Sequence, residues 1–222
     1  MKTRFEDGSC RYPQSNPFEL LDDRMLAKLG MDNPKRRIVM KPVITKDANA
    51  SIAFFGLSAY CGEDYEEACV QPNFSEWCQD RYNSKLKVVI DRHTVNPQFS
   101  GSAYYSNYFK VVLPEHMFKS AADVKPLMSD RSIINAMDTL CRKEIEQLIN
   151  SGCTVFVAFG EDAYNNIVRC LNLDRMHSIG TSGRLVRGNF NGKSIYLVRE
   201  RHFAYYSNKV TDGLDKELRE LT

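Results

Sequence analysis

The chain has 222 residues, of which 43% are hydrophobic and 26% are charged, and these values are typical of a folded globular protein rather than a disordered one. The formal net charge of +2 does not by itself indicate a nucleic-acid-binding protein. No apolar run approaches the roughly 20 residues of a membrane span, and the N-terminus lacks the apolar core of a signal peptide. We therefore expect a cytoplasmic protein with no membrane partner.

The first 37 residues are expected to form a peripheral arm and one helix. Asn16 is a favourable N-cap, Pro17 suits a first helical turn, and Gly30 suits a helix end. Apolar residues at helical spacing between them predict a helix over 18–29. Residues 38–222 are expected to form the core, so that residues 1–222 make a single α/β domain.

The run at 52–55 is short, wholly apolar and closed by Gly56, which is typical of a strand buried on both faces of a parallel sheet. Further strands are predicted at 38–44, 86–90 and 104–113, and part of 61–83 is expected to be helical. Because ligands bind at the carboxyl ends of such strands, the polar loop after Gly56 is the first candidate site.

The second half of the chain carries the clearest succession of elements. Apolar spacing predicts a helix over 132–150, a buried strand over 154–159 and a helix over 162–171. Asn191-Gly192 predicts a hairpin between strands at 184–190 and 193–199, and a final helix is expected at 210–221. The fold class is therefore α/β, with a short, mostly parallel central sheet.

The cysteines indicate neither disulfides nor a metal centre. There are seven of them, none forms a Cys-x-x-Cys pair, and Cys153 and Cys170 lie in apolar stretches. Free buried thiols are the simplest interpretation, and no metal and no cofactor are expected.

Three positions offer chemistry, two after predicted strands and one, Asn107, within a predicted strand. The loop from Gly56 to Tyr60 has a glycine for close approach, a hydroxyl at Ser58 and an aromatic ring at Tyr60, but its spacing alone favours a tight turn in which Tyr60 covers the core. Asn107 could read the edge of a base or face solvent on an edge strand. His202 could stabilise an anion or be an exposed histidine in an aromatic loop.

The region from 184 to 209 is basic, with six Lys or Arg residues and one acid. Its cations could hold phosphates and its aromatic side chains could stack on bases. The alternative is a solvated hairpin face. The residues predicted to contact nucleic acid are Arg184, Arg187, Arg199, Arg201, Tyr205, Tyr206 and Lys209.

The order of these motifs resembles the uracil-DNA glycosylase superfamily. The matching segments read Ile-Ala-Phe-Phe-Gly-Leu-Ser-Ala-Tyr at 52–60, Tyr-Ser-Asn-Tyr-Phe-Lys-Val-Val at 105–112, Val-Phe-Val-Ala-Phe-Gly-Glu-Asp-Ala at 155–163 and His-Phe-Ala from 202. The resemblance implies a three-layer α/β/α fold. It also implies a hydrolase of DNA repair by base excision, which cleaves the N-glycosidic bond of a flipped-out base.

The resemblance also implies roles for individual residues. Tyr60 would pack on the base beside Gly56, Asn107 would read its edge, and His202 would stabilise the departing anion. Ser58 would position the water, or Asp64 would do so instead, since the family has an acid or amide where Ser58 stands.

Three alternatives for the partner stay open. DNA, single- or double-stranded, is the partner that the resemblance implies. A catalytically silent member would bind nucleic acid or a partner protein. A third possibility is an enzyme that acts on a free nucleobase, nucleoside or nucleotide.

Overall fold

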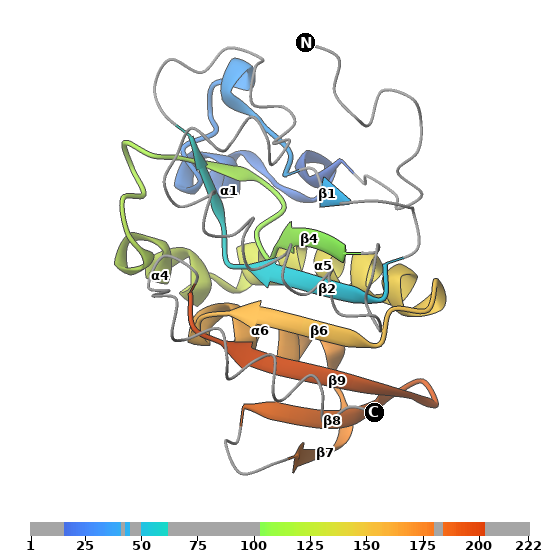
Figure 1. The fold of residues 1–222 in the computed structure, drawn as a ribbon. Coiled ribbons are helices and arrows are strands. Elements are labelled where there is room, and N and C mark those ends of the chain that lie inside the picture. The colour runs from blue at the N-terminus through green and yellow to red at the C-terminus, as the bar shows by residue number, and fades with distance from the viewer. Residues whose placement is uncertain (1–15, 41–42, 45–49, 62–102, 180–183, 203–222) are drawn as a thin grey trace.

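The structure is a computed structural model, and it describes residues 16–40, 43–44, 50–61, 103–179 and 184–202 (Figure 1). Within these residues, seven strands form one sheet in the order β1-β4-β2-β6-β9-β8-β7. Their bounds are β1 Val43–Ile44, β2 Ile52–Gly56, β4 Ala103–Asn107, β6 Val155–Phe159, β7 Asp174–Ile179, β8 Leu185–Phe190 and β9 Lys193–Glu200.

The four central strands of this sheet are parallel. β2 pairs with β4 on one side and with β6 on the other, and β6 pairs with β9. The outer strands β1, β8 and β7 are antiparallel to their neighbours. The predicted α/β class with a mostly parallel central sheet is therefore confirmed.

The apolar run at 52–55 forms the centre of the sheet, as predicted. Every residue of β2 is buried. Ala53 and Phe55 pack into one hydrophobic cluster, whereas Ile52 and Phe54 pack into a second. Since alternate residues of a strand face opposite sides, the two clusters lie on opposite faces of the sheet.

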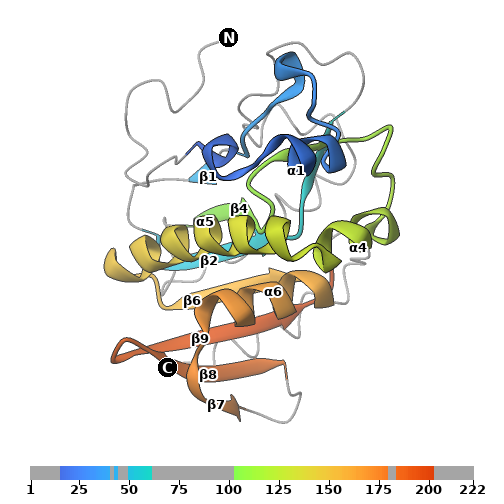
Figure 2. The ribbon, with the colours of Figure 1, turned by 180° about the vertical axis from the view of Figure 1, so that it is seen from behind.

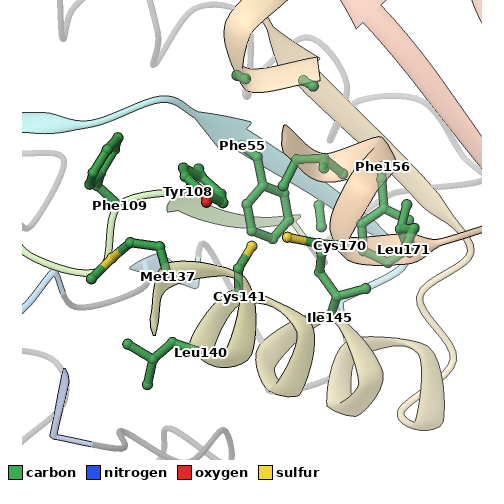
Figure 3. Close-up of a cluster of buried hydrophobic side chains, with 14 of the residues drawn as sticks. Phe55, Tyr108, Phe109, Met137, Leu140, Cys141, Ile145, Phe156, Cys170 and Leu171 are labelled. Atoms are coloured by element: carbon green, nitrogen blue, oxygen red, sulfur yellow. The ribbon is translucent and has the colours of Figure 1, made fainter. Parts of the chain in front are cut away.

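Helices α5 (Arg131–Asn150) and α6 (Glu161–Leu171) lie side by side over the first of these faces (Figure 2). Their apolar stripes, including Met137, Ile145 and Leu171, meet Phe55 and Phe156 of the sheet (Figure 3). Gly152 follows α5 with φ +104°, a conformation in which glycine is favoured. The predicted helices over 132–150 and 162–171 and the strand between them are thus confirmed.

The second face of the sheet is also closed to solvent. Phe54 and Val157 are fully buried, and Phe54 stacks on Phe159 with 5.9 Å between ring centroids. Ile38, Met40 and Val112 belong to the same cluster. An apolar core therefore lies on each side of the sheet.

The N-terminal helix predicted over 18–29 is in fact two short pieces, a 3-10 turn at Pro17–Leu20 and α1 at Asp23–Lys28. Asn16 caps the first piece, but the Asp22 carboxylate caps the second by accepting from the backbone N–H of Met25 at 2.8 Å. Leu21, between the pieces, is extended. The expected helix is therefore divided, because Asp22 is a second favourable N-cap and starts a new helix at Asp23. Another 3-10 turn, Pro34–Arg36, follows.

The strand predicted over 104–113 is also divided. β4 ends at Asn107, and the chain resumes as β5 (Val112–Pro114), which pairs with β3 (Ala59–Cys61) in a separate two-stranded sheet. In the interval, Lys110 turns its side chain into the core.

Other differences complete the comparison with the predicted elements. α4 (Ala121–Ser129), which contains Pro126, and β7 were not predicted. The predicted hairpin is confirmed as β8 and β9, with Asn191 and Gly192 at positive φ.

The strand expected at 38–44 forms only in part. Val39 makes an isolated antiparallel bridge to Val111, and Val43–Ile44 form the short strand β1. The elements expected at 86–90, 210–221 and nearly all of 61–83 lie outside the described residues. No helix in the described ranges is long and apolar enough to cross a membrane.

Candidate functional site

The order of the parallel strands identifies the edge of the sheet where a ligand would bind. From β2, the sheet grows toward β4 on one side, and the later strands β6 and β9 are added on the other side. The direction of winding therefore reverses between β2 and β6. In open α/β sheets, ligands bind outside the carboxyl ends of the strands at such a reversal.

The carboxyl ends of β4, β2, β6 and β9 align across the sheet. Asn107 lies opposite Gly56, and Phe159 lies opposite Glu200. We call these residues and those that directly follow the strands the carboxyl edge, and its members are Gly56–Tyr60, Asn107, Phe159, Gly160 and Glu200–His202. The structure thus places Gly56, Ser58, Tyr60, Asn107 and His202 at one edge; a shared pocket remains a prediction.

In the segment after β2, the Ser58 and Tyr60 side chains are joined by a hydrogen bond. Ser58 Oγ donates to Tyr60 Oη at 2.7 Å, and the next residues form β3. Burial raises the pKa of Tyr60, although the hydrogen bond from Ser58 works against this rise. The two side chains therefore act as one polar pair, with the phenol protonated at neutral pH.

Asn107 is buried rather than facing solvent. Its Oδ1 accepts from the Tyr105 hydroxyl at 3.1 Å, and its Nδ2 donates to the Met40 sulfur at 3.5 Å. A Cβ at Gly56 would lie 2.2 Å from Asn107 Oδ1, so the absence of a side chain at Gly56 makes room for this amide. This contact explains why the strand ends in glycine.

The end of β9 carries a buried acid that the sequence did not single out. Glu200 is 2% exposed, its Oε1 accepts from the backbone N–H of Arg201 at 2.7 Å, and its carbonyl accepts from the Gly160 N–H at 2.7 Å. The available signal was that Glu200 is the one acid in a basic stretch. It ties the end of β9 to the start of α6.

His202 lies two residues after the end of β9 and is half-buried. Burial lowers the pKa of His202 from its usual value of 6.5, which favours the neutral imidazole at neutral pH. A neutral imidazole can donate one hydrogen bond and accept another, but it does not supply a positive charge.

The arginines of the hairpin lie on opposite faces. Arg199 lies over the Tyr164 ring of α6 at 5.8 Å, and its backbone N–H donates to the Arg184 carbonyl at 2.8 Å. Arg187 instead lies over Tyr196 of the opposite face and donates from Nε to Ser194 Oγ at 2.7 Å. We call Arg184, Arg199 and Arg201 the edge arginines, because they adjoin the carboxyl end of β9, whereas Arg187 lies within the hairpin.

The N-terminus of α6 reaches the same edge through Gly160, whose φ is +87°. Its first turn carries Glu161 and Asp162. Carboxylates at a helix N-terminus offset the positive end of the helix dipole. Positive charge at this edge therefore comes from the arginines rather than from the helix.

Several predicted residues lie outside the described part of the chain, namely Asp64, Tyr205, Tyr206 and Lys209. Within the part that is described, no group of three or more His, Cys, Asp or Glu side chains could hold a metal ion.

No protein-family model and no curated protein matched the chain. Among the solved structures that match, three are described here. A Salmonella typhimurium LT2 protein named for a proposed tRNA synthase activity is 8% identical, with a TM-score of 0.36 over 76% of this chain and 41% of the other. Haemophilus influenzae protein HI1011, of the DUF1537 family, is 11% identical, with a TM-score of 0.35 over 83% and 43%.

The third match is a DUF1537 domain of unknown function from Bordetella bronchiseptica, solved with bound citrate as a domain-swapped dimer. It is 10% identical, with a TM-score of 0.32 over 72% of this chain and 39% of the other. The chain spans about two fifths of the length of the three proteins.

These matches correct the expected family. Two are named as DUF1537 proteins, and none of the three is named as a DNA glycosylase. The prediction of a uracil-DNA glycosylase that acts in DNA repair by base excision is therefore wrong. The roles that the resemblance implied for Ser58, Asn107 and His202 lose that basis.

Proposed function

We propose that the protein binds a small anionic molecule, bearing a phosphate or carboxylate, at the carboxyl edge near the β2–β6 reversal. The observation that carries this proposal is the strand order, which directs the ends of four parallel strands to one edge at a change of winding direction. The polar residues described above stand at that edge.

The edge arginines supply donors for an anion, beside the carboxylates of Glu161, Asp162 and Glu200 at the same edge. Arg199 and Arg201 are exposed, and Arg184, the residue directly before β8, lies beside Arg199. A guanidinium presents a planar set of donors that matches carboxylate and phosphate oxygens, frequently through two parallel hydrogen bonds. Contact with the Tyr164 ring holds the Arg199 guanidinium over the first turns of α6.

Uncharged groups at the edge would complete recognition. The Ser58–Tyr60 pair and the neutral His202 imidazole can donate and accept hydrogen bonds without adding charge. Nucleotides are the first ligands to test, because they combine a phosphate with hydroxyl groups and a flat ring. Free nucleobases and DNA, single- or double-stranded, remain predicted partners of the same arginines.

Isothermal titration calorimetry tests the proposal, with inorganic phosphate, citrate, AMP, ATP and short oligonucleotides as probes. We expect one of the small anions to bind. Arg199→Ala or Arg201→Ala should weaken it by roughly tenfold or more, the usual effect of losing a charged hydrogen bond. Arg187→Ala is the matched control, since this arginine lies within the same hairpin on the other face.

The outcomes separate the alternatives. Binding that is lost equally in Arg187→Ala would contradict a site at the carboxyl edge. Binding of oligonucleotides alone, with an affinity that falls steeply with salt, would favour a nucleic-acid partner instead. No binding by any probe would overturn the proposal.

We also propose that the chain is a single domain of three layers. α5 and α6 supply one outer layer, and the complete burial of Phe54 and Val157 supports a second layer over the opposite face.

A further inference from the structure

Two cysteines that lie far apart in the sequence meet between α5 and α6. Cys141 belongs to α5 and Cys170 to α6, and their sulfur atoms point toward each other beneath Phe55 (Figure 3). The two thiols are close enough for each to affect the titration of the other. Both are free cysteines, with exposures of 0% and 2%.

A polar cluster lies against one side of this pair. The Cys170 thiol donates to Asp138 Oδ1 at 3.4 Å, and Asp138 is held by Arg169 and by the Tyr108 hydroxyl. The neighbouring Cys141 thiol and burial both raise the pKa of the Cys170 thiol. The Cys170 thiol is therefore protonated and unreactive in the closed structure at neutral pH.

We propose that Cys141 and Cys170 are a modification site, which oxidants of the peroxide class convert into a disulfide that joins α5 to α6. The two sulfur atoms face each other between α5 and α6 (Figure 3), and this geometry carries the proposal, because disulfide formation requires both sulfurs within reach of each other. Peroxide is small and uncharged, so it can enter when the two helices separate locally.

The chemistry balances in two steps. One thiol loses its proton, and its thiolate attacks peroxide, so that the O–O bond breaks and a sulfenic acid and hydroxide form. The second thiolate then attacks the sulfenic sulfur, the S–O bond breaks, and the S–S bond forms. The two thiols lose two protons and two electrons in total, and peroxide is reduced to two molecules of water.

The disulfide would change the behaviour of α6 in particular. α6 begins at the carboxyl edge, and the bond would fix it to the long helix α5 across a loop of about 30 residues. Closing a loop of this length in the unfolded chain is expected to raise Tm by roughly 10 °C.

Peptide mapping after oxidation tests the proposal. The folded protein is treated with hydrogen peroxide, unfolded, alkylated and digested without reductant. We expect a cross-linked peptide pair that contains Cys141 and Cys170, a mass lower by two hydrogens, and a higher Tm that reductant reverses. The rate should rise with pH, because the thiolate is the reacting form.

Variants identify the partners. Cys141→Ala and Cys170→Ala should each lose the cross-link and the rise in Tm, whereas Cys153→Ala, which changes another buried thiol, should retain both. Alkylation of Cys141 and Cys170 in the peroxide-treated wild-type protein, or a cross-link to a different cysteine, would overturn the proposal. The wild-type peptide map decides even if a variant fails to fold.

Discussion

At the scale of single residues, the contact between Gly56 and Asn107 determines how β2 and β4 end. The buried amide occupies the space that a side chain at residue 56 would need. Its partners are the Tyr105 hydroxyl and the Met40 sulfur, which belong to the second face of the sheet. Gly56 thus has a packing role in addition to its place at the candidate site.

Gly56→Ala should therefore destabilise the protein. A Cβ would lie 2.2 Å from Asn107 Oδ1 and 2.9 Å from the Tyr105 hydroxyl, so the amide must move and its hydrogen bond is lost. Overpacking of this kind costs about 1–3 kcal/mol in the free energy of unfolding, measured by urea denaturation. In an Asn107→Ala background the same change should cost clearly less, and equal costs in both backgrounds would contradict the explanation.

A second residue-scale feature is the buried ion pair between Lys110 and Glu144. Lys110 Nζ also donates to Ser106 Oγ at 3.0 Å and lies 5.2 Å from the Phe55 ring centroid. The Tyr104 hydroxyl donates to the same glutamate. Burial opposes ionisation of Lys110, but the Glu144 carboxylate prevails and raises its pKa.

Lys110→Met should reduce the free energy of unfolding by about 3–5 kcal/mol, because it leaves the buried Glu144 carboxylate without its charged partner. Adding Glu144→Gln, which still accepts from Tyr104, should recover most of this loss. The raised pKa means that the contribution of Lys110 is fully present below its unfolded pKa of about 10.4 and is lost as pH rises through the folded value. A single variant as stable as wild type in urea would contradict the prediction.

At the scale of elements, α5 and α6 are held together at their solvent side by a charged contact. Arg169 of α6 binds both carboxylate oxygens of Asp138 in α5, with distances of 2.7 and 2.9 Å. Burial opposes ionisation of Asp138, but the hydrogen bonds from Arg169 and Tyr108 prevail and lower its pKa. The ionised form of Asp138 thus stabilises the helix pair.

This contact predicts a specific pH dependence. Because the folded pKa of Asp138 lies below its usual 3.8, its contribution is present above that value and is lost as pH falls through the folded pKa. Asp138→Asn should therefore destabilise the protein at neutral pH and make little difference in strong acid, as measured by urea denaturation across pH. Glu146→Gln, which removes the exposed pair with Arg142, should change stability little at any pH.

The elements that the sequence predicted well are those that local pattern determines. The apolar run of β2, the helical stripe of α5 and the Asn191-Gly192 turn each depend on neighbouring residues alone. The prediction of one continuous strand over 104–113 was wrong because Lys110 turns inward to Glu144, which is 34 residues away in the sequence. α4 was missed because Pro126 opposes a helical interpretation.

In the candidate site, too, some features follow from local sequence pattern and others depend on contacts between distant segments. The rule for parallel strands was enough to predict that Gly56 and His202 share one edge, whereas Asn107 lies there because β4 ends earlier than predicted. The burial of Glu200 and the opposite faces of Arg187 and Arg199 depend on strand register, which no single segment of sequence contains. The family resemblance misled because strand, glycine and helix recur in this order across α/β proteins generally.

At the scale of the whole molecule, both faces of the central sheet are apolar and buried. Phe54 and Phe55 are neighbours on β2 that face opposite sides, and both are fully buried. A sheet with one open face would leave Phe54 exposed. The burial of Phe54 therefore supports the proposal of a third layer.

Phe54→Ala and Phe55→Ala should therefore destabilise the protein to a similar extent, by about 3–5 kcal/mol each. Urea denaturation of both variants measures the effect, and a single cooperative transition in the wild type would support one domain. Leu20 is an exposed apolar residue and serves as the control, since Leu20→Ala should change stability little. A nearly neutral Phe54→Ala would contradict the three-layer proposal.

The central position of β2 also has a consequence for synthesis on the ribosome. β2 is the first of the four parallel strands to be made, yet its partners β4 and β6 follow about 50 and about 100 residues later. At roughly 5–20 residues per second, the nascent strand waits on the order of 5–20 s for its second neighbour. Throughout that interval an uncharged, apolar segment is without its final contacts. The yield of folded protein in cells should therefore depend on elongation rate and on chaperones that cover this segment.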